Sequence, residues 1–145
     1  MYRRLLCMLG TGADADRVLQ RAITARDTFS AQLFLLRVVE FLPVSGAEDA
    51  MLATPLVLAD QMEAQAREQM QLWAQTAEVP AEQTRVAQGD LMQEAERCVQ
   101  DWDIDLIVLG KHERHGFSSW FNQSEDDILH GSRCDLLAVH LTTAD

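Results

Sequence analysis

The sequence predicts a single doubly wound α/β domain, in which a five-stranded parallel sheet carries helices on both faces. Short apolar runs alternate along the chain with segments whose apolar residues recur at helical spacing. Glycine closes several of these runs, as it does where a buried parallel strand ends. The 145 residues, 48% hydrophobic and 24% charged, suit one domain (1–145) with one core.

The first half of the chain predicts two strands and two helices. Residues 5–9 form an apolar strand run that Gly10-Thr11-Gly12 closes, and Asp14 suits the first turn of the helix that follows. Residues 32–39 predict the second strand, and 40–53 a loop. Thr54-Pro55 predicts a helix start. The helix then carries an apolar stripe made of Leu58, Met62, Ala66, Met70, Trp73 and Ala77.

The second half predicts three more strands. Residues 84–88 form a weaker strand run before Gly89, and Asp90 can cap a helix with one apolar face. Residues 105–110 are the clearest buried strand, followed by a polar loop over 111–123. Ser124, with acidic residues after it, predicts a short helix. The last strand covers 136–139.

Composition excludes several classes of partner and cofactor. The net charge of −11, from 23 acidic and 12 basic residues, argues against nucleic acid and anionic membranes as partners. No apolar stretch approaches the roughly 18 residues of a membrane span. Cys7, Cys98 and Cys134 are odd in number and widely spaced, so we expect no disulfide framework, no metal and a cytoplasmic location.

A ligand in this fold would bind outside the carboxyl ends of the strands. Residues there include Gly10, Val39, Gly89, Gly110, Lys111 and His112. Residues 10–15 also fit the dinucleotide pattern G-x-G-x-x-A, with Glu40 ending the next strand. Asp14 and Asp16 would repel a pyrophosphate, so a plain strand-to-helix turn is the preferred interpretation.

Catalytic signals are weak. The cluster 111–115 could hold a phosphate or a metal, or supply His112 or His115 as an acid-base group, but a solvated loop is the stronger interpretation. His130 and His140 have no evident partners. The three cysteines lie on apolar segments, where a thiol behaves as a small hydrophobe. We therefore expect no enzymatic activity.

The last strand predicts an interface, because it is apolar on both faces and would lie at an edge of the sheet. Pairing with a second copy across a two-fold axis would cover that edge. The tail 142–145 is too short to cover much of it. We therefore expect a homodimer through Leu136, Leu137, Ala138, Val139, His140 and Leu141.

Several segments together resemble the universal stress protein family over nearly the whole chain. These segments are residues 1–6, Gln88-Gly89-Asp90-Leu91, residues 103–110, Lys111-His112 and residues 134–139. The chain is most similar to the A-type branch. This resemblance implies the family's nucleotide-binding-like α/β fold, dimerisation through the last strand, a role in the stress response and protein partners of unidentified kind.

One branch of that family binds ATP through a late G-x2-G-x9-G-[ST] motif and an aspartate at the end of the first strand. Here Gly110 matches the first glycine and Ser124 the hydroxyl position, but Glu113 and Gln123 replace the other glycines and Gly10 replaces the aspartate. Side chains there hinder the approach of a phosphate to backbone amides. We expect no tightly bound ATP and no other cofactor. The alternative is a degenerate adenine-nucleotide pocket at Val39, Gly89, Gly110 and Ser124.

Overall fold

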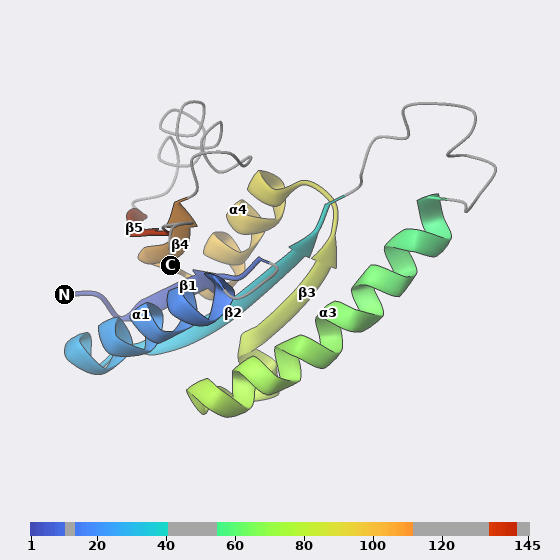
Figure 1. The fold of residues 1–145 in the computed structure, drawn as a ribbon. Helices are drawn as coiled ribbons and strands as arrows, with labels where there is room; N and C mark the ends of the chain where they lie inside the picture. Colours follow the sequence, from blue (N-terminus) through green and yellow to red (C-terminus); the bar gives the residue numbers. More distant parts are fainter. Residues whose placement is uncertain (11–13, 41–54, 112–133, 142–145) are drawn as a thin grey trace.

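The computed structural model describes residues 1–10, 14–40, 55–111 and 134–141 (Figure 1). The elements are β1 (Arg4–Met8), α1 (Asp14–Phe29), β2 (Gln32–Val39), α3 (Pro55–Ala77), a short 3-10 helix (Ala81–Gln83), β3 (Thr84–Gln88), α4 (Leu91–Trp102), β4 (Leu106–Lys111) and β5 (Asp135–His140). All strand pairs are parallel, and the order across the sheet is β3-β2-β1-β4-β5. The predicted fold class is therefore confirmed.

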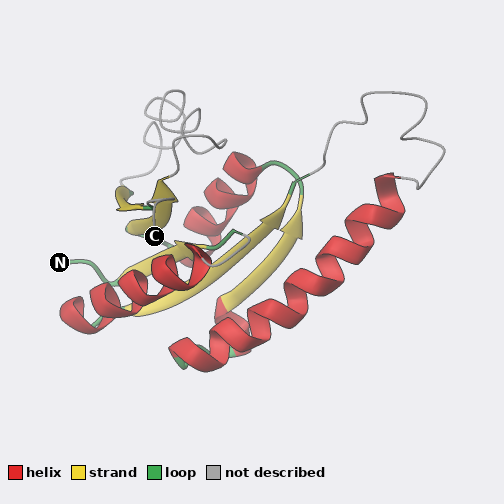
Figure 2. Cartoon of the chain, in the orientation of Figure 1, coloured by secondary structure: helices red, strands yellow, loops and turns green. Residues whose placement is uncertain are grey.

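Helices cover both faces of the sheet, with α1 and α3 on one side and α4 on the other (Figure 2). Alternate residues of each strand supply the two cores, because successive side chains point to opposite faces. Leu5 and Cys7 pack with α1 and α3, whereas Leu6 and Met8 pack with α4. The central strand β1 is thus buried on both faces, as its unbroken apolar run predicts.

The predicted element bounds agree closely with the structure, and one part of the predicted core is wrong. The strands 32–39 and 84–88 have the predicted bounds, as do the helix start at Pro55 and its end at Ala77. Leu58 does not join the core, because its side chain is 47% exposed near the start of α3. The predicted helix after Ser124 lies outside the described residues.

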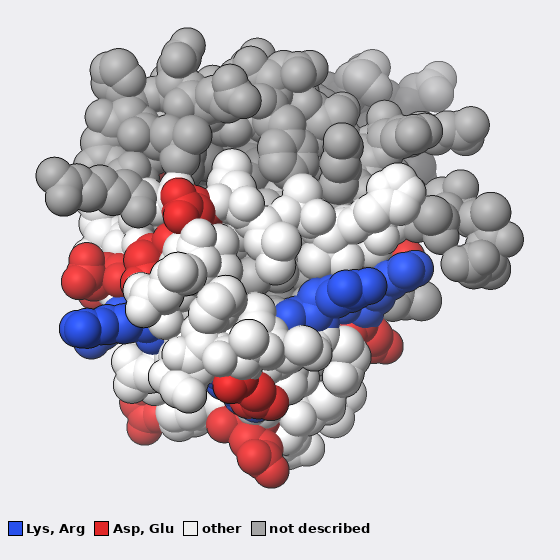
Figure 3. All heavy atoms as spheres, turned by 90° about the vertical axis from the view of Figure 1, so that its left-hand side faces the viewer, with Lys and Arg blue, Asp and Glu red and all other residues white. Residues whose placement is uncertain are grey.

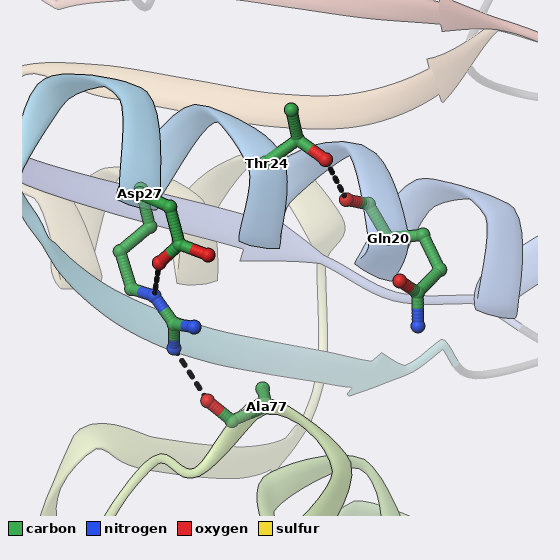
Figure 4. A network of polar contacts seen from close by, with 5 residues as sticks. Gln20, Thr24, Asp27 and Ala77 are labelled. Atoms are coloured by element: carbon green, nitrogen blue, oxygen red, sulfur yellow. Dashed lines mark hydrogen bonds and ion pairs between the residues drawn. The ribbon is translucent and has the colours of Figure 1, made fainter.

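Arg26 joins the end of α1 to the end of α3 through contacts with Asp27 and Ala77, which are labelled in Figure 4. Its guanidinium lies 3.0 Å from Asp27 Oδ1 and donates a second hydrogen bond to the carbonyl of Ala77. That carbonyl belongs to the last turn of α3, where backbone acceptors have no partner within the helix. Arg26 therefore fixes the two helices that share one face of the sheet.

No helix in the described part of the chain is long and apolar enough to cross a membrane.

The amino ends of the strands are held together by Asp105, the residue before β4. Its Oδ2 accepts a hydrogen bond from the backbone N–H of Arg3 at 2.9 Å, and its Oδ1 accepts one from Arg4 at 3.1 Å. The Asp105 N–H donates to the Arg4 carbonyl, and the Asp105 carbonyl accepts from the N–H of Asp135. Tyr2 adds a hydroxyl hydrogen bond of 2.6 Å to Asp135 Oδ2. One aspartate thus connects β1, β4 and β5.

Candidate functional site

The predicted ligand-binding residues that the structure describes all lie at the carboxyl edge of the sheet. Gly10 follows β1, Val39 ends β2 and Gly89 follows β3. Gly110 is the penultimate residue of β4. Because β1 pairs with β2 on one side and with β4 on the other, Gly10 and Gly110 flank the point where the winding direction changes. In doubly wound folds a ligand crevice forms at such a point.

Gly110 is closely packed, whatever its role toward a ligand. A Cβ at this position would lie 2.6 Å from Leu141 Cδ1 and 3.0 Å from Val18 Cγ2. Real Cβ atoms essentially never approach another atom as closely as the first distance. The glycine lets β4 pass beneath α1 and beneath the residue that follows β5. Close packing therefore explains why Gly110 matches the first glycine of the ATP motif, and no bound phosphate is needed to explain it.

The other two glycines at this edge differ from Gly110 and from each other. A Cβ on Gly10 would meet no described residue within 4 Å, so the described part of the chain leaves room beside the end of β1. Gly89 has a φ of +145°, a conformation that strains any residue with a side chain, and its N–H donates to the Val39 carbonyl at 3.0 Å. Gly89 therefore makes a turn that leads into α4, which Asp90 caps through a 3.0 Å hydrogen bond from the Gln93 N–H.

One charged side chain at this edge, that of Arg37, is not among the site residues predicted from the sequence. Arg37 lies on β2, two residues before the end of the strand, and is half-buried. Burial lowers the pKa of its guanidinium, and the nearby Glu40 carboxylate opposes that shift. The position of Arg37 inside the otherwise apolar run 33–39 is the sequence feature that indicates this side chain. Of the predicted site residues, His112 and Ser124 lie outside the described residues, and for Lys111 only the backbone is described.

Residues 1–140 match the sequence model described as "Universal stress protein family". The chain belongs to that family. It is 28% identical over 141 residues to "Universal stress protein A homolog 2" of Coxiella burnetii. The alignment covers 97% of this chain and 96% of that protein.

Solved universal stress proteins share the fold. The UspA structure from Lactobacillus plantarum aligns with a TM-score of 0.70 at 19% identity, over 95% of this chain and 97% of that one. A universal stress protein described in complex with cAMP aligns with a TM-score of 0.55 at 18% identity, over 97% of this chain and 99% of that one. At these identities the likeness extends to the fold alone.

The cysteines of this universal stress protein are poor nucleophiles, as predicted. All three are buried. Burial alone raises the pKa of the Cys7 thiol far above its usual range. Burial also raises the pKa of Cys98 to about 11, and burial together with the carboxylates of Asp105 and Asp135 raises that of Cys134 to about 12. A thiol that stays protonated at neutral pH is a weak nucleophile.

The last strand lies at an edge of the sheet, as predicted. Beyond β4, no described strand pairs with β5. Leu137 is 42% exposed and Leu136 is half-buried, whereas Val139 and Leu141 point into the core. Figure 3 shows the side on which the amino terminus and β5 lie in Figure 1, and its described surface is mostly uncharged, with a few separate groups of charged side chains.

Proposed function

We propose that this universal stress protein acts without enzymatic activity, as a cytoplasmic homodimer that assembles through β5 and communicates through contacts with other proteins. The observation that carries the proposal is the exposed edge of β5. An apolar edge strand with free backbone groups is an aggregation hazard unless another strand covers it. A second copy placed across a two-fold axis would extend the sheet and cover Leu137 on both chains.

The test compares two exposed leucines. Lysine in place of Leu137 puts a charge into the proposed interface. Leu72→Lys changes a 62% exposed leucine on α3, a helix that packs on β2 and β3, and two strands separate these from β5. Sedimentation equilibrium at micromolar concentration should give a dimer mass for the wild type and for Leu72→Lys, and a monomer mass for Leu137→Lys. A monomeric wild type would refute the dimer.

The proposal includes the absence of tight ATP binding. Gly10 provides no carboxylate at the end of β1, and the contacts of Gly110 with Leu141 and Val18 explain that glycine by packing. Gly10 therefore lacks one contact of the family's ATP site, and the match at Gly110 does not by itself indicate a phosphate.

A second candidate function is binding of an adenine nucleotide. The open space beside Gly10 favours it, as does the similarity in fold to a universal stress protein described in complex with cAMP. Equilibrium dialysis of nucleotide-free protein against ATP and against cAMP separates the two candidates. We expect no saturable binding below millimolar concentration, and micromolar binding of either nucleotide would favour the second candidate.

A further inference from the structure

The other edge of the sheet, β3, borders a cavity of about 550 Å³. Thr84, Arg85 and Val86 line it on one side. Because successive side chains of a strand point to opposite faces, a cavity bordered by three consecutive residues lies at the edge of the strand. A flank of α3 that carries Arg67 and Gln71 forms the opposite wall. We call this cavity the β3-edge groove.

Backbone groups of Val86 face the β3-edge groove. The Gly89 N–H donates to the Val39 carbonyl, and in a parallel pair the residues that bond to the neighbour alternate along the strand. Arg85 and Ala87 therefore turn their backbone groups toward β2, and Val86 turns its N–H and carbonyl outward. No described residue supplies a partner for these two groups. Unpaired groups of this kind are the template on which an added strand forms.

Two arginines, Arg67 and Arg85, line the same groove in a chain whose net charge is −11. Arg85 is held in place by Asp101 at 3.1 Å and lies 4.6 Å from the centroid of the Trp102 ring. Arg67 is 61% exposed and lies 3.3 Å from Glu63. Each guanidinium has further N–H groups, which can donate to another carboxylate. The groove therefore combines an open backbone edge with the exposed guanidinium of Arg67 on α3, whereas the Arg85 guanidinium lies against α4.

We infer that the β3-edge groove binds an extended acidic peptide by strand addition. The peptide backbone exchanges hydrogen bonds with the N–H and carbonyl of Val86, and its carboxylates reach Arg67. A small anion would use Arg67 but leave the backbone groups of Val86 unpaired, so the groove fits a peptide better. This site lies at the opposite edge of the sheet from β5 and does not depend on dimerisation.

A fluorescein-labelled Val-Glu-Val-Glu-Val peptide, amidated at its end, is the probe, and fluorescence anisotropy with the full chain is the measurement. We expect the glutamate peptide to bind. The same peptide with lysine in place of both glutamates should bind about tenfold more weakly. Arg67→Glu should weaken binding of the acidic peptide about tenfold and favour the lysine peptide. Arg97→Glu is the matched control, because Arg97 on α4 is 63% exposed and also paired with a glutamate, at 3.1 Å. It should leave both affinities unchanged.

A second measurement separates strand addition from simple charge attraction. A peptide with the same side chains but N-methylated backbone should bind at least about tenfold more weakly, because it loses its donors. Amide exchange of Val86 should slow on binding of the unmodified peptide, whereas Arg85 and Ala87 should change little. Lack of binding at millimolar peptide, equal binding of the N-methylated peptide, or full competition by inorganic phosphate without protection of Val86 would each overturn the inference.

Discussion

The two ends of the sheet are organised differently. At the amino end, hydrogen bonds from Arg3 and Arg4 converge on the carboxylate of Asp105, and the backbone of Asp105 bonds to both β1 and β5. At the carboxyl end, three strands finish at or beside glycines, which contribute no side chain. Polar contacts therefore fix the amino end, whereas close packing and open space shape the carboxyl end.

This difference separates a part of the molecule that stabilises the fold from the part where doubly wound folds form their ligand crevice. Side-chain hydrogen bonds at the amino end can be removed one at a time, and each removal should cost a modest amount of stability. At the carboxyl end, a side chain added to a glycine either collides with the core or enters open space. Substitutions at the two ends test this division.

Gly110→Val should have the largest effect, because its Cβ would collide with Leu141 and Val18. We expect a loss of about 3 kcal/mol or more in the free energy of unfolding, measured by urea denaturation. Gly10→Ala is the matched control and should change stability by less than about 0.5 kcal/mol, since its Cβ meets nothing within 4 Å. Equal losses in the two variants would contradict the packing role of Gly110.

Asp105→Ala should have the next largest effect, because it removes the acceptor of two backbone hydrogen bonds. We expect a loss of about 2 kcal/mol in the same measurement. Asp105→Asn keeps one acceptor oxygen and should lose about half as much. If alanine and asparagine behave alike, the two hydrogen bonds do not contribute separately.

Cys134 should make stability fall in alkaline solution. Its pKa is raised from 9.0 to about 12 in the folded chain, by burial and by the carboxylates of Asp105 and Asp135. The contribution is fully present below pH 9 and is lost as the pH rises toward 12, because only the unfolded thiol then releases its proton. Cys134→Ala should reduce the slope of stability against pH above 9 by up to about 1 kcal/mol per pH unit. An unchanged slope would show that this thiol does not titrate on unfolding.

Tyr2→Phe should have the smallest effect of the four. It removes the hydroxyl hydrogen bond to Asp135 but keeps the edge-to-face ring contact with Phe29, whose centroid is 5.1 Å away. Because this hydroxyl is exposed to water, we expect the melting temperature to fall by no more than about 2 °C. A larger fall would mean that the hydroxyl fixes the amino terminus more strongly than its exposure suggests.

The elements could be predicted from the sequence because their signals are local. The apolar run before Gly89, the Asp90 cap and the stripe ending at Ala77 each depend on neighbouring residues alone. Leu58 was assigned to the core wrongly, because helical spacing shows which residues share a face but not how far the sheet extends beneath them. The strand order could not be obtained in this way.

The candidate sites were less predictable, because they depend on contacts between distant residues. The need for glycine at position 110 comes from Leu141, which reaches it only once β5 has paired with β4. The outward direction of the Val86 backbone follows from the register between β2 and β3. The proposed dimer and the absence of tight ATP binding both remain predictions.

The strand order has a consequence for folding during synthesis. The first strand made, β1, lies at the centre of the sheet, and one of its neighbours is β4 at residues 106–111. The fully buried Leu5, Leu6 and Cys7 can pair with β2 early, but their other edge stays open until most of the chain has been made. An apolar strand edge exposed for that long is prone to pair with other chains. The nascent chain is therefore most vulnerable to aggregation just before β4 is synthesised, and completion of β4 ends that period.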